Sequence, residues 1–258
     1  ELLVQFSYFS ANPNKITMIL IAVATSIGGV GIPLLTENYV KGDFRAAGKL
    51  VQDNLTMLVA FLLPATIGAV AIAEPLYTVF YGKPDSLALG LFILAMLQTV
   101  ILGLYTVLSP MIQALFQNRK AILYFGYGVL VKLILQVPFI YVFKAYGPLL
   151  STTIGLMIPI VLMYKEIHQV THFNRKTVFK RSLLTAILTL IMLLVVLVAG
   201  LILGLVIKPN GRVTSMIYVA LIGGVGIVVY GGLGLRLRFL DRFIGSKAAS
   251  LRNKFHIS

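Results

Sequence analysis

Long uninterrupted apolar runs dominate the chain and are separated by short polar segments. The seven runs are 16–35, 54–73, 87–109, 121–143, 147–164, 183–207 and 216–235. Each is close to the ~20 residues that an α-helix needs to cross about 30 Å of hydrocarbon. None of them alternates between apolar and polar residues, as the strands of a membrane barrel do. The pattern predicts an all-α, polytopic membrane protein with about seven transmembrane helices.

Two of the polar connections have a pattern of their own. The stretch TENYVKGDFRAAGKLVQDN follows the first run and is polar on one side only. We therefore expect a short helix that lies on the membrane surface there. The stretch AEPLYTVFYGKPDS follows the second run and is expected to form a tight external hairpin.

The composition excludes a water-soluble globular domain of useful size. Of the 258 residues, 59% are hydrophobic and only 12% are charged, and the mean hydropathy is +0.95. A soluble domain carries about 25% charged residues, so this chain has too few polar groups to cover a surface in water. Cysteine is absent, which excludes disulfides, thiolate chemistry and cysteine-ligated metals.

The lysines and arginines predict the orientation. Sixteen of the 22 fall in connections on one side of the predicted membrane, and five fall on the other. Since basic residues gather in cytoplasmic loops, the C-terminus is predicted to be cytoplasmic and the N-terminus external. The same rule explains the net charge of +14 without nucleic acid as a partner. No signal peptide is visible, so an odd number of helices is expected before Glu1, and seven would give fourteen.

The pattern divides the chain into three parts. Residues 1–182 are expected to form a transport lobe of five transmembrane helices with a cytoplasmic loop. Residues 183–235 are expected to form a C-terminal transmembrane hairpin. Residues 236–258 interleave arginine and lysine with phenylalanine and leucine, so we expect an amphipathic tail that binds the anionic inner leaflet.

Lys132 is the one formal charge inside the predicted helices. It belongs to a stripe at four-residue spacing with Tyr124, Gly128 and Gln136. A lysine at a helix centre costs about 2.5–3.5 kcal/mol, so it needs a partner or a role. One interpretation is an ion pair that locks two helices together, and the other is a cavity cation that binds an anionic substrate.

The predicted helices offer no acidic partner to this lysine. None of the seven runs contains aspartate or glutamate, so a partner would come from a helix end, such as Glu37 or Asp53, or from sequence outside the chain. That absence favours an anionic ligand. In the third run, Gln98 is a further candidate contact, on one face with Tyr105.

Small residues mark the last two runs. Gly200 and Gly204 form a GxxxG pattern in the sixth, and the seventh is rich in glycine, including Gly224 and Gly231. Such residues let helix backbones approach closely, so we expect helix packing or a groove for a lipid tail at these positions.

No pattern of covalent catalysis is present. The chain lacks the phosphate-binding motif GxxxxGK[ST] and any obvious Ser/His/Asp set. His168 and His172 are four residues apart, but the sequence KEIHQVTH is not HExxH. We therefore expect no metal, no cofactor and no enzymatic activity, and a protein that works through gradients or binding energy.

Four segments carry a resemblance to a known family: IPLLTENYVKGDFRAAGKL, LLPATIGAVAIAEPLYTVFYG, LSPMIQALFQNRKA and YGPLLSTTIG. Their order resembles the C-terminal half of the multidrug/oligosaccharidyl-lipid/polysaccharide flippase superfamily, in particular its MviN/MurJ and SpoVB/YtgP branch. That resemblance implies fourteen helices, alternating access, and transport of lipid-linked cell-wall precursors, lipid II above all. It also implies cavity cations, for which Lys132 and Lys15 are the candidates, and a polyprenyl-tail groove beside the last two helices.

The functional hypothesis is therefore a flippase of the bacterial plasma membrane. Its expected partners are a polyprenyl-pyrophosphate-linked oligosaccharide, the anionic inner leaflet and the upstream half of the same chain. One alternative is a multidrug or cation antiporter of the same superfamily, which usually keeps acidic residues inside its helices. The other is a membrane glycosyl- or acyltransferase, which would need an external Asp/His cluster that the short outer loops do not offer.

Overall fold

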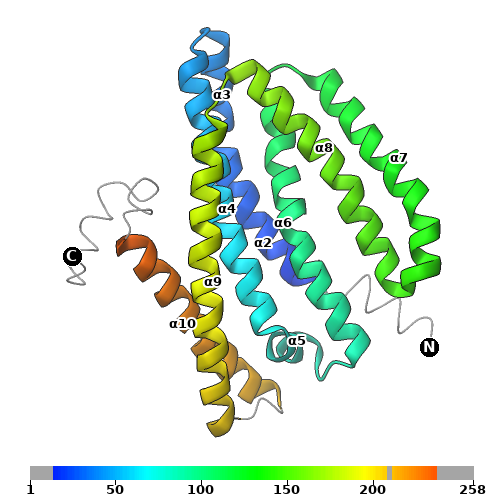
Figure 1. Cartoon of the computed structure of the whole chain (residues 1–258), viewed down its shortest axis with the longest axis vertical. Helices are drawn as coiled ribbons and strands as arrows, with labels where there is room; N and C mark the ends of the chain where they lie inside the picture. The colour runs from blue at the N-terminus through cyan, green and yellow to red at the C-terminus, as the bar shows by residue number, and fades with distance from the viewer. Residues whose placement is uncertain (1–13, 208–210, 237–258) are drawn as a thin grey trace. The chain divides into compact units, whose positions relative to one another are not determined.

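The computed structural model describes residues 14–207 and 211–236, without the side chains of Asn14, Lys15 and Val206 (Figure 1). All its regular elements are helices. They are α2 (Asn14–Val30), α3 (Ile32–Val40), α4 (Phe44–Ala71), α5 (Ala73–Tyr81), α6 (Ser86–Ala114), α7 (Asn118–Phe143), a 3₁₀ turn (Lys144–Tyr146), α8 (Gly147–Thr171), α9 (Arg175–Val206) and α10 (Arg212–Arg236). The all-α prediction is confirmed.

The described helices are long and apolar enough to cross a membrane in six segments: Ile16–Val40, Phe44–Ala71, Ser86–Ala114, Asn118–Thr171, Arg175–Leu205 and Arg212–Arg236. The fourth holds two helices, α7 and α8, which return along each other (Figure 1). The segments therefore correspond to the seven predicted runs.

Both connections with a predicted structure of their own differ from the prediction. The expected surface helix does not exist as a separate element, because Thr36 belongs to α3 and Phe44 already begins α4. The expected hairpin is the helix α5, which Gly82 ends with a positive φ of 88°. Apart from short turns at 41–43 and 82–85, both connections are helical, and a helix satisfies its backbone groups internally as a bilayer requires.

Exposed apolar side chains support the membrane assignment. Large hydrophobic residues on α7, α9 and α10 are exposed, including Ile134, Val137, Leu201, Leu205 and Ile227. Large exposed apolar side chains on each of these helices are suited to contact with lipid.

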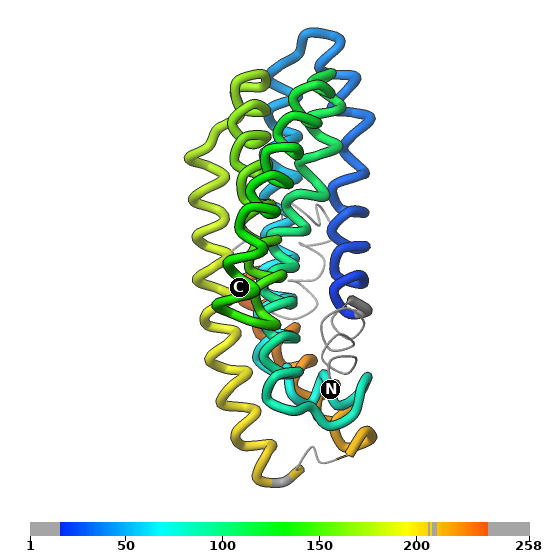
Figure 2. The backbone as a smooth tube through the Cα atoms, turned by 90° about the vertical axis from the view of Figure 1, so that its right-hand side faces the viewer, coloured from blue at the N-terminus to red at the C-terminus, as the bar shows by residue number. Residues whose placement is uncertain are grey.

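The helices form two compact units, and the first comprises residues 1–62 and 85–182. In this unit α6 packs against α2 and against α8, and α8 packs against α7. Figure 2 looks at the unit from the side of α7. The core includes fully buried Leu58, Leu108, Met111, Met163 and Ile167.

The start of α6 is fixed by a helix cap. The side chain of Asp85 accepts a hydrogen bond of 2.6 Å from the backbone N–H of Ala88. Such a cap satisfies one of the N–H groups that a helix leaves free at its first turn.

The second unit comprises residues 63–84 and 183–258, of which the structure describes all but 208–210 and 237–258. Its small core consists of Ile72, Met192, Val196 and Ile222, and α10 packs against α5. The unit therefore joins the two C-terminal helices to a helix that precedes them by a hundred residues in the chain.

The predicted contact between the last two helices needs one correction. The hydroxyl of Tyr218 on α10 donates a 2.9 Å hydrogen bond to the carbonyl of Gly200 on α9, so Gly200 lies in the contact. Gly204 does not, because no described atom lies within 4 Å of the position that a Cβ would take there. The same open space surrounds Gly224 and Gly231. Their expected role at a lipid-tail groove stays a prediction.

Candidate functional site

The site is built where α7 and α8 touch backbone to backbone. A Cβ added to Gly128 would lie 2.5 Å from the carbonyl oxygen of Gly155. A Cβ added to Gly155 would lie 2.8 Å both from the carbonyl oxygen of Gly128 and from Cβ of Lys132. No larger side chain fits either position without movement of the backbone. The first carbons of the Lys132 side chain therefore lie directly on α8.

Lys132 lines a small cavity at this contact. The cavity has a volume of about 110 Å³, and its lining residues are Phe125, Gly128, Val129, Lys132, Thr152, Gly155, Leu156 and Pro159. Lys132 is half-buried, and its ammonium makes no hydrogen bond or ion pair with any described residue. The cavity wall is otherwise mainly apolar, so the site presents a single cation in apolar surroundings.

The helix-end carboxylates considered as partners of Lys132 are used elsewhere. Glu37 on α3 pairs with Lys41, the residue that follows this helix, at 2.5 Å. Asp53 accepts a 3.0 Å contact from the guanidinium of Arg181. Neither carboxylate neutralises Lys132.

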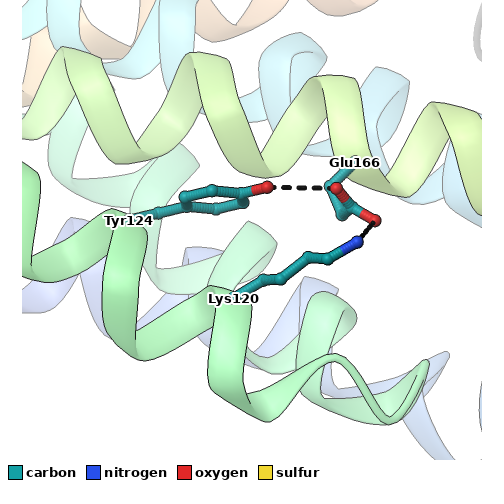
Figure 3. A network of polar contacts seen from close by, with 3 residues as sticks. All are labelled: Lys120, Tyr124 and Glu166. Carbon is teal, nitrogen blue, oxygen red and sulfur yellow. Dashed lines mark hydrogen bonds and ion pairs between the residues drawn. The ribbon is translucent and has the colours of Figure 1, made fainter.

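A buried glutamate on α8, Glu166, contacts the beginning of the α7 stripe. The sequence analysis did not include it among the candidate residues. Glu166 is only 7% exposed, and its Oε1 lies 2.6 Å from Nζ of Lys120 (Figure 3). Its Oε2 accepts a 3.0 Å hydrogen bond from the hydroxyl of Tyr124. Tyr124 therefore binds a carboxylate of the protein, and the two α7 side chains hold α7 and α8 together at this end.

The seven apolar runs contain no acidic residue, but the helices extend beyond the runs and include Asp53 in α4 and Glu166 in α8. The fifth run was ended at residue 164, whereas α8 continues to Thr171 and includes Glu166. The signal was present in α7, where Lys120 continues the four-residue spacing of Tyr124, Gly128 and Lys132 by one turn. Lys120, Tyr124, Gly128 and Lys132 all contact α8.

The remaining candidate residues do not gather at Lys132. Gln98 is buried on α6 and donates a 3.2 Å hydrogen bond to the carbonyl of Leu149 in the first turn of α8. Gln136 is half-buried on α7 and does not line the cavity. The side chain of Lys15 lies outside the described residues. Among the described residues, no group of three His, Cys, Asp or Glu side chains could hold a metal ion.

Comparison with known proteins finds similarity to lipid II flippases. No family model matches the chain. The lipid II flippase MurJ of Bacillus subtilis strain 168 is 29% identical over 239 residues, which is 91% of this chain and 44% of that protein. A solved structure of lipid II flippase MurJ in an inward closed conformation matches with a TM-score of 0.57 and 19% identity, over 93% of this chain and 44% of that one.

These matches confirm the predicted resemblance. The chain spans less than half the length of the curated relative that it matches. The sequence is similar to part of a lipid II flippase, and the chain shares its helical fold with part of the solved structure.

Proposed function

We propose that the chain forms the C-terminal part of a bacterial flippase that moves lipid-linked cell-wall precursors, with lipid II as the substrate, by alternating access. The observation that carries this proposal is the similarity to the lipid II flippase MurJ over 91% of the chain. The relative is named for transport and not for a covalent reaction, which favours a transporter over the membrane transferase. The expected substrate is a polyprenyl-pyrophosphate-linked oligosaccharide in the plasma membrane.

In this proposal Lys132 binds the pyrophosphate. Its ammonium has no carboxylate partner in the described part of the chain, and apolar residues surround it. A charge in such surroundings interacts strongly with an anion because little water screens it. Gln98, Gln136 and Lys15 remain predicted substrate contacts. Tyr124 is bound to Glu166 in this conformation, so a contact to substrate would require that hydrogen bond to open.

The antiporter alternative gains one argument from the structure. Its main weakness was the lack of an acidic residue within the helices, and Glu166 is such a residue. However, Lys120 already pairs with that carboxylate at 2.6 Å, which lowers its availability for a transported cation. The similarity to a lipid II flippase supports lipid transport over this alternative.

The decisive experiment replaces Lys132 by methionine in the full-length protein. The change keeps the apolar stem and removes the ammonium, so we expect normal membrane levels and flipping of a fluorescent lipid II analogue lowered roughly tenfold or more. Lys132→Arg is expected to recover part of the activity. The matched control is Lys83→Met, which removes an exposed lysine between α5 and α6.

Two results would contradict the role of Lys132. Wild-type flipping by Lys132→Met at normal levels would remove the residue from the mechanism. Reduced levels with flipping in proportion would make it a structural lysine. A flippase that transports drugs or cations but not lipid II would overturn the proposed substrate.

The orientation is a separate part of the proposal. The distribution of basic residues supports cytoplasmic placement of residues 165–181, which include the end of α8 and the beginning of α9, and of the tail 236–258. The tail lies almost wholly outside the described residues. Single cysteines at Asp85 and Ser246 of this cysteine-free chain test the orientation in intact cells. An impermeant thiol reagent should label the first from outside and spare the second, and the opposite result would invert the topology.

A further inference from the structure

A second hollow lies in the first unit, between α4, α6, α8 and the beginning of α9. It has a volume of about 350 Å³, and most of its wall is apolar. Leu55, Leu108 and Val178 are buried in it, whereas Val161 is 48% exposed. It therefore opens from a buried apolar floor to the surface of the unit. We refer to it as the α8–α9 groove.

Two cations line this groove. Lys165 lies near the end of α8, and Arg175 is the first residue of α9. Both side chains are exposed, and neither forms an ion pair with a carboxylate of the described residues. The guanidinium of Arg175 lies 5.9 Å from the ring centroid of Tyr164, which also lines the groove. The polar ends of two helices thus bring two unneutralised charges to an apolar groove.

The groove is distinct from the Lys132 cavity. The α8 residues of the cavity are Thr152, Gly155, Leu156 and Pro159, and those of the groove are Ile160, Val161, Tyr164 and Lys165. At 100° per residue, the centres of these two sets lie on roughly opposite faces of the helix. A ligand that binds Lys132 therefore does not fill the groove.

We propose that the α8–α9 groove binds an anionic glycerophospholipid, with an acyl chain on Leu55, Leu104 and Leu108 and the headgroup phosphate at Lys165 and Arg175. An apolar slot with a cationic end matches an amphiphile whose charge lies at one end of its chain. Both cations lie at helix ends, where the headgroup layer of a bilayer begins. Lysines and arginines near that layer attract anionic lipids.

The experiment measures which lipid occupies the groove. Met157 is exposed on α8, one turn before Val161, and the chain contains no cysteine of its own. Met157→Cys in an otherwise cysteine-free full-length protein carries a bimane fluorophore in nanodiscs of phosphatidylglycerol and phosphatidylcholine. Bromine on the acyl chains of one lipid at a time quenches the fluorophore only at short range.

With the wild-type groove residues, brominated phosphatidylglycerol should quench the fluorophore clearly more than brominated phosphatidylcholine at equal mole fraction. Each cation near the headgroup layer raises the affinity for an anionic lipid about fivefold. The Lys165→Gln/Arg175→Gln variant should therefore lose up to about 25-fold in its preference for phosphatidylglycerol. The matched control is Lys176→Gln/Lys180→Gln, which removes two exposed charges of α9 that do not line the groove. This control should keep the preference.

A second variant separates groove binding from general attraction to the membrane surface. Val161→Trp keeps both cations and fills the groove mouth at an exposed position, so it should also abolish the preference. A preference retained in Val161→Trp would overturn the proposal, as would equal quenching by the two lipids. Displacement by unbrominated polyprenyl diphosphate would show that the groove binds the carrier lipid instead. None of these outcomes depends on flipping by Lys132 variants.

Discussion

The helix pair α7–α8 and the helix pair α9–α10 both carry many glycines, but the glycines have different surroundings. In the first pair Gly128 and Gly155 face each other, and each would place a Cβ within 2.8 Å of the opposite backbone. In the second pair Gly200 meets the hydroxyl of Tyr218, while Gly204 has no described atom within 4 Å. Two glycines four residues apart, as in GxxxG, therefore do not predict a close contact by themselves.

The difference lies in what each helix offers to the other. Close approach needs a small residue on both helices at the same level, and Gly155 supplies it to Gly128. Across from Gly200 lies Tyr218, a large residue whose hydroxyl binds the glycine carbonyl. The first pair is thus fixed by backbone packing and by the Lys120–Glu166–Tyr124 network. The second is held by a small apolar core and by side-chain hydrogen bonds such as that from Tyr218 to the carbonyl of Gly200.

The largest effect is expected from leucine at the α7–α8 contact. In Gly155→Leu the new side chain would meet the Gly128 carbonyl and Cβ of Lys132, so the two helices must separate. Overpacking of a core typically costs about 1–3 kcal/mol, and here the obstacle is backbone. We expect loss of most folded protein, measured as the monodisperse fraction in detergent and by its thermal midpoint.

Gly204→Leu is the matched change in the other pair. A close contact at Gly204 would make this substitution disturb folding or transport, but the open space there gives the opposite expectation. It should leave the thermal midpoint close to wild type. If both leucines destabilise equally, the contrast between the helix pairs is wrong.

A smaller effect is expected from Tyr124→Phe. The change removes the hydrogen bond to Oε2 of Glu166 and leaves the ring in place. A hydrogen bond to a charged group contributes about 1.5–3 kcal/mol, and the partial exposure of Tyr124 puts the expected loss at the lower end. Thermal unfolding of the full-length protein measures it.

Tyr127→Phe is the control for this change, because Tyr127 lies on the same helix but is 50% exposed. It should be neutral. If Tyr124→Phe preserves stability but lowers flipping, the hydroxyl serves the substrate, as the sequence suggested. Equal stability and equal flipping would remove Tyr124 from both roles.

The helices could be predicted from the sequence because a bilayer restricts which structures a chain can adopt within it. Every backbone group within hydrocarbon must be bonded within its own helix, so a run of about 20 apolar residues has few alternatives. Helix ends were less predictable. Glu166 was placed outside the fifth helix because the apolar run stops at residue 164, although the helix continues for two more turns. A helix can continue through a charged residue such as Glu166 when a partner on another helix, here Lys120, neutralises the charge.

The candidate site was predictable only in part, and the stripe on α7 shows why. Its period showed that Tyr124, Gly128, Lys132 and Gln136 share a face, which the contacts of the first three to α8 bear out. The period does not say what lies opposite. Tyr124 binds a carboxylate, Gly128 packs against a glycine and Lys132 lines a mainly apolar cavity. Along the chain, Glu166 follows Tyr124 by 42 positions and Gly155 follows Gly128 by 27. The α8 residues of the cavity follow Lys132 by 20–27 positions. Which residues pair therefore depends on the turn between α7 and α8.

The smallest effect is expected from Tyr218→Phe on α10. The change removes the 2.9 Å hydrogen bond to the carbonyl of Gly200, which is already bonded within α9 in an ordinary helix. Because that carbonyl keeps its helical partner, the loss should be near the lower end of the usual 0.5–1.5 kcal/mol for a neutral hydrogen bond. Tyr141→Phe, at a tyrosine that is 89% exposed, is the control and should be neutral. Protease resistance of the connection between α9 and α10 reports on the second unit, whereas the thermal midpoint reports on the whole protein. A loss larger than that of Tyr124→Phe would mean that the hydroxyl of Tyr218 holds the second pair together as firmly as Glu166 holds the first, and the contrast between the two pairs would fail.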